Sequence, residues 1–119
     1  MKEFDSEVFK LSVGFSKRIR RLVKAMSKSD QMTIGHQLLR ATISISSNIA
    51  EGFGRNSDPQ IINFLNIAHG SCCEAISQLM VLDGEEVEGS IFVATELIEE
   101  AINIKNQLRK LIYHFNSKR

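Results

Sequence analysis

The chain has 119 residues, of which 43% are hydrophobic and 24% are charged, and its formal net charge is +1. This balance excludes a disordered chain and predicts one soluble domain over residues 1–119, while the small net charge excludes strong bulk attraction to nucleic acid. No apolar run reaches the roughly 20 residues that a membrane span needs, and the acidic N-terminus is unlike a signal peptide. We therefore expect a cytoplasmic protein with no membrane partner.

The first predicted helix covers residues 5–28. Apolar residues recur every three or four positions from Phe4 to Met26, which is typical of a helix with one buried face. The same segment also carries a strip of basic residues that could contact the phosphates of RNA or DNA. These candidate contacts are Lys17, Arg18, Arg20, Arg21, Lys24 and Lys28.

The second predicted helix covers residues 31–54 and has more apolar surface than one bundle core needs. One stripe runs from Ile34 through Leu38, Ala41 and Ile45 to Ile49, and further apolar residues lie beside it. Surplus apolar surface on a helix favours contact with another subunit. With two residues of the third helix, the predicted subunit interface consists of Leu39, Ile43, Ala50, Phe64 and Ile67.

The end of this helix has two interpretations, because the stretch "SISSNIAEGFGR" closes with two glycines and an arginine. A phosphate-binding glycine loop follows a strand and precedes a helix, and usually contains a lysine. Here the glycines follow a helical pattern instead. We therefore expect Gly52 and Gly54 to unwind the helix, with Arg55 near the negative end of the helix dipole.

Two further helices are predicted, over residues 59–83 and 90–115. Asp58 before Pro59 is typical of a helix start, and Gly84 is typical of a helix end. The acidic stretch of residues 84–89 is expected to be a loop. Four helices with short connections predict an all-α, antiparallel up-down-up-down four-helix bundle.

Polar residues on the second helix form a strip that has little surface left for water. Gln37, Ser44 and Asn48 share one line, with Arg40 and Glu51 on the next. Partly buried polar groups need partners, which Ser71 and Glu74 of the third helix could provide, including an ion pair from Arg40 to Glu51 or Glu74. This strip is interpreted either as a structural network that fixes helix register or as a functional surface.

Catalytic and metal sites have weak support in the sequence. None of the histidines, at positions 36, 69 and 114, follows a glutamate by three residues, as a di-iron bundle site would require. Cys72 and Cys73 are adjacent, so we expect reduced thiols rather than a disulfide or a zinc site. Without a nucleophile motif we expect no enzyme activity, and no cofactor, metal or small-molecule substrate is inferred.

"QLLRATISISSNIAEGFGR" followed by "FLNIAHGSCCE" resembles the bacterial four-helix-bundle family encoded in intervening sequences of 23S rRNA genes. It is also similar to the accessory protein of diversity-generating retroelements. The resemblance implies a ring-like homopentamer without known enzymatic activity, and nucleic-acid association in parts of the group. The motif residues it implies are Gln37, Arg40, Ser44, Asn48, Glu51, Gly52 and Arg55, with Gly70, Ser71 and Glu74 in the third helix.

Two interpretations of the charge pattern stay open. In an up-down bundle the acidic start of the fourth helix lies beside the basic end of the first helix. The two could neutralise each other in exposed ion pairs worth about 0.2 to 1 kcal/mol each. Leu39, where many relatives carry a second arginine, also removes a positive charge. The sequence thus predicts an oligomeric scaffold or adaptor, either with RNA or DNA association or as a protein assembly module without it.

Overall fold

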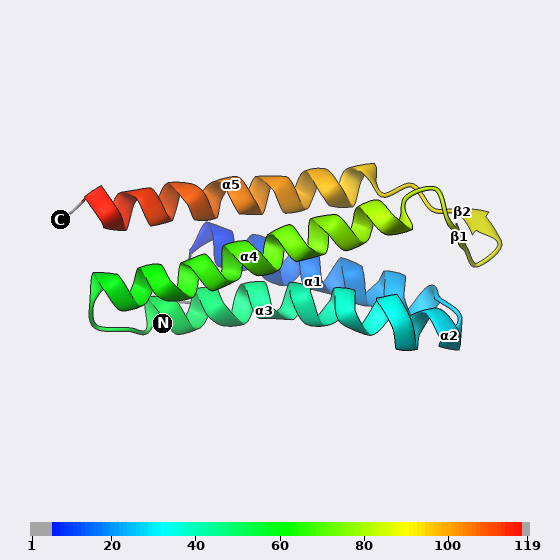
Figure 1. Cartoon of the computed structure of the whole chain (residues 1–119), viewed down its shortest axis with the longest axis horizontal. Coiled ribbons are helices and arrows are strands. Elements are labelled where there is room, and N and C mark those ends of the chain that lie inside the picture. Colours follow the sequence, from blue (N-terminus) through cyan, green and yellow to red (C-terminus); the bar gives the residue numbers. More distant parts are fainter. Residues whose placement is uncertain (1–5, 118–119) are drawn as a thin grey trace.

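Four long helices run antiparallel along a molecule that measures 52 × 21 × 21 Å (Figure 1). The computed structural model describes residues 6–117. The long helices are α1 (Glu7–Ala25), α3 (His36–Phe53), α4 (Asp58–Leu82) and α5 (Thr95–Ser117). They confirm the predicted all-α, up-down-up-down bundle.

The connection between the first two long helices is itself mostly helical. After α1 the chain turns at Met26, and α2 (Lys28–Asp30) continues through the π-helical turn η2 (Gln31–Gly35) into α3. The predicted extension of the first helix to residue 28 is therefore wrong, because Lys28 already begins the next helical segment. Phe4, which was predicted on the first helix, lies outside the described residues.

The turn between α3 and α4 corrects two predictions. Gly52 does not unwind α3; it is buried inside the helix, and only Gly54 caps the helix end. The cap of α4 is Ser57 rather than Asp58, because the Ser57 hydroxyl accepts a hydrogen bond from the backbone N–H of Gln60 at 3.4 Å.

A small hairpin, β1 (Glu86–Val87) and β2 (Ser90–Ile91), replaces the predicted loop and the first turn of the predicted fourth helix. Its strands pair antiparallel, and both turn residues have positive φ, 51° at Glu88 and 77° at Gly89. Such a two-residue turn matches the twist of paired strands. As a result α5 begins at Thr95 rather than near residue 90, and ends two residues beyond the predicted residue 115.

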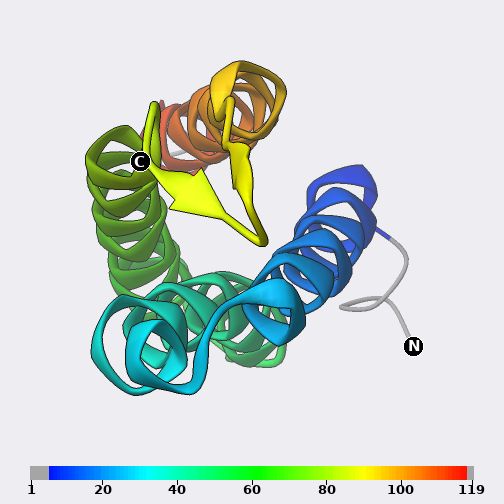
Figure 2. The same cartoon turned by 90° about the vertical axis from the view of Figure 1, so that its right-hand side faces the viewer.

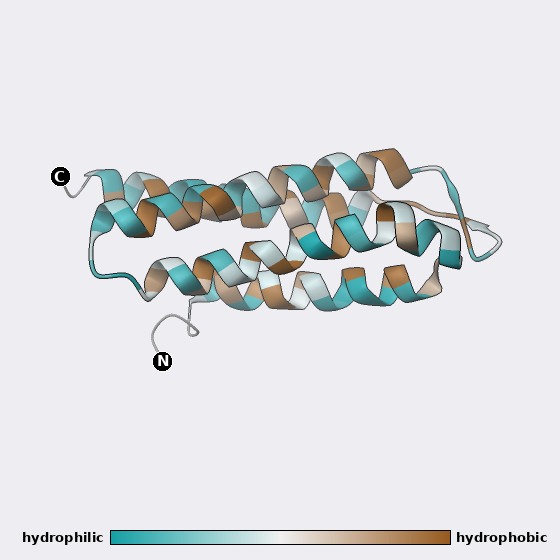
Figure 3. Cartoon of the chain, turned by 60° about the horizontal axis from the view of Figure 1, so that its bottom comes forward, coloured by the Kyte–Doolittle hydropathy of each residue, from teal (hydrophilic) through white to brown (hydrophobic). Residues whose placement is uncertain are grey.

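The core lies on the axis around which the helices are arranged. Figure 2 looks along the bundle and shows α1 beside α3, α3 beside α4, and α4 beside α5. Figure 3 shows hydrophobic and hydrophilic residues alternating along each helix, as one-sided burial requires. Most of the predicted stripes are buried, and the largest fully buried side chains include Phe15, Ile19, Leu38, Ile45, Ile49, Leu65, Leu79, Ile104 and Leu108.

Candidate functional site

A groove lined only by cations runs along the C-terminal half of α1. Lys17, Arg20, Arg21 and Lys24 follow one another at spacings of three, one and three residues, so they project from neighbouring positions on the helix. The groove has a volume of about 260 Å³, and all four residues are exposed. Within residues 6–117 none of the four makes an ion pair. We call this surface the basic groove.

The other two predicted cations lie outside the basic groove. Arg18 forms a bidentate ion pair with Glu100 of α5, with its Nε 2.9 Å from Oε1, and this hydrogen bond raises the pKa of Arg18. Lys28 stands on α2, beyond the end of α1. Neutralisation of α1 by the acidic start of α5 is therefore limited, in the part of the chain that the structure describes, to this one pair.

A second groove lies between α1 and α3, next to the basic groove. Its volume is about 160 Å³, and Lys17 and Arg20 line both grooves. The remaining lining is mainly apolar and includes Leu39 and Ile43 of the predicted subunit interface. Ile43 is 49% exposed although it is a large apolar residue. We call this surface the apolar groove.

The predicted interface residues differ in their surroundings. Ile67 of α4 is exposed like Ile43, whereas Leu39, Ala50 and Phe64 are half-buried within the chain. Phe64 packs against α3 at Gly52, and the Arg55 guanidinium lies 4.7 Å above its ring centroid. Phe64 therefore already has a role inside the bundle.

Three of the motif residues form a hydrogen-bonded network between α3 and α4. The hydroxyl oxygens of Ser44 and Ser71 lie 2.8 Å apart. The Asn48 amide donates to the Ser44 carbonyl at 2.8 Å and to its hydroxyl at 3.0 Å. All three residues are half-buried. This contact fixes the register of the two helices, as expected for a structural network.

The charged motif residues do not join this network. Arg40 is exposed and, within residues 6–117, pairs with neither Glu51 nor Glu74, which corrects the predicted ion pair. Glu51 instead accepts a hydrogen bond from Arg55 at 3.1 Å, one helical turn away. Glu74 accepts one from Gln78 at 3.2 Å. Gln37 is exposed on α3.

The two cysteines are free thiols on α4, as predicted, but in different environments. Cys72 is fully buried, and its Sγ donates to the carbonyl oxygen of Ala101 at 3.0 Å. Burial is the main cause that raises its pKa to about 12. Cys73 is exposed, with its Sγ 3.9 Å from Nδ1 of His69.

Residues 6–117 contain no cluster of three or more His, Cys, Asp or Glu side chains that could hold a metal ion. Over the same range, none of the helices combines the length and the hydrophobicity needed to cross a lipid bilayer.

Residues 4–114 match the family of 23S rRNA-intervening sequence proteins. The chain belongs to this family. A solved structure with the same fold is a protein of unknown function from the S23 ribosomal protein family of Bacteroides thetaiotaomicron. It is 28% identical, with a TM-score of 0.79, and the match covers 95% of this chain and 99% of that one. No curated protein matches the chain.

Within this member of the 23S rRNA-intervening sequence family, the stretch from Asn48 to Gly52 lies at the α3–α4 contact. At one end of the motif, Asn48 donates within α3 to the Ser44 hydroxyl, which in turn meets Ser71 of α4. At the other end, Gly52 allows the close approach of Phe64 on α4. Of the predicted site residues, the structure therefore joins Ser44, Asn48 and Ser71 in one network. It places the basic strip on a separate face.

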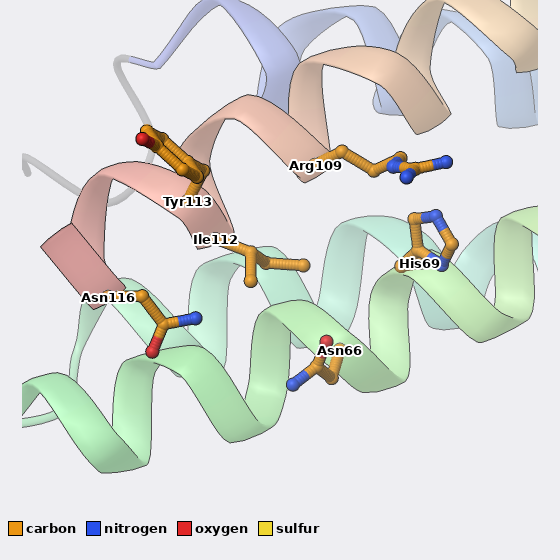
Figure 4. A pocket seen from close by; sticks show the side chains of 6 residues that line it. All are labelled: Asn66, His69, Arg109, Ile112, Tyr113 and Asn116. Atoms are coloured by element: carbon orange, nitrogen blue, oxygen red, sulfur yellow. The ribbon is translucent and has the colours of Figure 1, made fainter.

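Sequence reasoning missed a pocket between α4 and α5. The pocket has a volume of about 460 Å³ and is lined by Asn66, His69, Arg109, Ile112, Tyr113 and Asn116 (Figure 4). Polar residues at helical spacing on each helix are a weak signal for such a site. Only the pairing of the end of α5 with the start of α4 brings them together.

Proposed function

We propose that this protein is a non-catalytic, oligomeric scaffold of the cytoplasm that holds the phosphate backbone of RNA or DNA along the basic groove. The observation that carries the proposal is the set of four exposed cations, which make no ion pair within residues 6–117. Four positive charges this close repel one another, and a bound phosphate reduces that repulsion. Binding also releases the counterions that surround the nucleic acid, which favours association. The family name, which refers to 23S rRNA, supports structured RNA as the first partner to test.

Assembly into a homopentamer is part of the same proposal. Ile43 and Ile67 expose 49% and 45% of their surface on α3 and α4, and their burial against another subunit would stabilise an oligomer. Four cations per chain give weak binding at physiological salt, but five copies presented together would bind one RNA with avidity.

A protein assembly module without nucleic-acid binding is the second candidate. The observation that favours it is that Lys17 and Arg20 line both the basic and the apolar groove. A neighbouring subunit or partner protein seated on the apolar groove would then cover part of the basic groove as well. In that case the cations would form ion pairs across a protein interface.

Binding of fluorescently labelled structured RNA and duplex DNA, followed by anisotropy at low salt, separates the two candidates. The double substitution Arg20→Gln/Lys24→Gln should weaken binding of both nucleic acids at least tenfold, because two phosphate contacts are lost. The matched control Lys10→Gln/Lys110→Gln removes the same charge from exposed positions outside the groove and should bind like the unmodified protein. Equal weakening in both variants, or no binding at low salt, would favour the assembly module.

A further inference from the structure

The pocket between α4 and α5 has the size and the lining of a small-molecule site. Its volume of about 460 Å³ falls within the range of roughly 300 to 1,000 Å³ that is usual for ligand pockets. Three of its residues carry side-chain amides or an imidazole, one carries a guanidinium and one a phenol ring. Figure 4 shows Arg109 extending from α5 above the imidazole ring of His69 on α4.

The electrostatics of the pocket favour an anion. No carboxylate lines it, and within residues 6–117 the exposed Arg109 makes no ion pair. Burial lowers the pKa of His69, and the nearby charges of Arg109 and Lys105 lower it further, so the imidazole is neutral near pH 7. Arg109 in the lining and Lys105 near His69 thus place two positive charges around this end of the pocket, and no ion pair to either is found within residues 6–117.

One ring nitrogen of His69, Nε2, is buried without a hydrogen-bond partner among the described residues. The other ring nitrogen, Nδ1, has only the distant Sγ of Cys73 at 3.9 Å. A buried polar atom without a partner costs on the order of 1 to 3 kcal/mol, so a ligand atom that satisfies it is stabilised. A ligand in the pocket reaches this buried nitrogen only when the ring turns toward the pocket, a change that NMR of the ring would detect.

The far side of the pocket suits a nucleoside. Asn66 and Asn116 each offer an amide that both donates and accepts hydrogen bonds, as ribose hydroxyls and base edges require. Ile112 adds an apolar side chain to the lining, and Tyr113, which is 75% exposed, offers an aromatic ring for stacking. The planar guanidinium of Arg109 matches a phosphate with two parallel hydrogen bonds.

We propose that the α4–α5 pocket binds a nucleoside phosphate monoester, with the phosphate held by Arg109 and His69 and the nucleoside by Asn66, Asn116 and Tyr113. This site departs from the sequence expectation that the protein has no small-molecule ligand. The phosphate monoester belongs either to a free mononucleotide or to the terminal nucleotide of an RNA strand. The pocket shares no residue with the basic groove, so the two proposals stand or fall separately.

Protonation of His69 should be linked to binding. The charged groups that face its ring are Arg109 and Lys105 on α5, with the Cys73 thiol on its own helix. A bound phosphate dianion offsets the two positive charges and stabilises the imidazolium, so it raises the pKa of His69. Binding of the phosphate should therefore move the titration of the His69 ring to higher pH, which NMR of the ring measures directly.

Calorimetric titration of the full chain with adenosine 5′-monophosphate, together with NMR of the His69 ring, tests the proposal. We expect binding that shifts the His69 resonances and is weakened at least tenfold by Arg109→Gln, with adenosine giving no measurable heat. The control Lys110→Gln removes a charge from the adjacent exposed residue, outside this pocket, and should bind normally. Equal affinity of adenosine and its monophosphate, no effect of Arg109→Gln, or no change at His69 would each overturn the proposal.

A second pair of probes identifies the source of the phosphate. On the Arg20→Gln/Lys24→Gln variant, in which the basic groove is weakened, a tetraribonucleotide with a 5′-phosphate should bind through Arg109, and the same strand with a 5′-hydroxyl should bind much more weakly. On this variant, tighter binding of the phosphorylated strand than of the mononucleotide assigns the site to RNA ends, and the reverse order assigns it to free nucleotides. Arg20→Gln/Lys24→Gln should leave mononucleotide binding unchanged, and a loss there would refute a separate pocket.

Discussion

Substitution of Gly52 by alanine tests whether the central motif residue serves the contact between α3 and α4. A Cβ placed on Gly52 would lie 3.1 Å from the Cβ of Phe64 and 3.3 Å from the carbonyl oxygen of Ile61. Carbon atoms pack best at about 3.5 to 4.0 Å, so the methyl group would penetrate the Phe64 contact by roughly 0.5 Å. Both obstructing atoms are fixed to the α4 backbone, and relief requires the two helices to separate.

The magnitude follows from two opposing effects. Alanine in place of glycine inside a helix stabilises it by about 1 kcal/mol. Overpacking of a close contact costs about 1 to 3 kcal/mol. Gly52→Ala should therefore change the free energy of unfolding by between about 0 and −2 kcal/mol.

Gly70 provides the matched control, because it also lies inside a long helix but a Cβ there would meet nothing within 4 Å. Gly70→Ala should stabilise the protein by about 1 kcal/mol. Urea unfolding followed by circular dichroism, at one protein concentration for all variants, should thus separate the two by about 1 to 3 kcal/mol. Equal stabilisation by both substitutions would refute the close approach of α3 and α4 at Gly52.

Three further predictions concern the surface, the network and the thiols. Ile43→Glu should lower the sedimentation coefficient of the assembly and keep the helical circular dichroism signal, because this side chain is 49% exposed in the single chain. An unchanged sedimentation profile would show that Ile43 is not part of the subunit interface. Asn48→Ala should cost about 1 kcal/mol in urea unfolding, whereas the exposed Arg40→Ala should change it by less than about 0.5 kcal/mol, and the opposite order would argue against the network. At about pH 8 a thiol reagent should modify Cys73 in the folded protein and Cys72 only after unfolding. Because burial raises the pKa of Cys72 from 9.0 to about 12, the unfolded chain loses this proton first, and stability should fall as the pH rises between these values. Reaction of both thiols in the folded state would contradict the buried position.

Helical periodicity was sufficient to predict the bundle, since burial on one face of a helix repeats every three or four residues. The stripe from Leu38 to Ile49 is buried as expected. The hairpin at Glu86–Ile91 was not predicted, because four paired residues carry no periodic signal and the turn at Glu88 lacks a typical turn residue before Gly89. Gly52 was wrongly predicted to unwind the helix. The neighbouring sequence does not distinguish a glycine that allows close helix packing from one that ends a helix.

The candidate sites likewise differ in whether local sequence was enough to predict them. The strip from Lys17 to Lys24 was predictable because one helix determines its spacing. Its exception, Arg18, pairs with a glutamate 82 residues further along the chain, which no local pattern reveals. The α4–α5 pocket also depends on tertiary pairing, since His69 and Arg109 approach each other only through the antiparallel packing of their helices.

The measurement that most directly tests the proposed function is the dependence of RNA affinity on salt concentration. Each phosphate contact contributes about 0.7 to 0.9 to the slope of log association constant against log salt. The unmodified protein should therefore show a slope steeper by at least about 1.4 than Arg20→Gln/Lys24→Gln, with Lys10→Gln/Lys110→Gln retaining the full slope. Equal slopes for all three proteins would contradict phosphate binding in the basic groove.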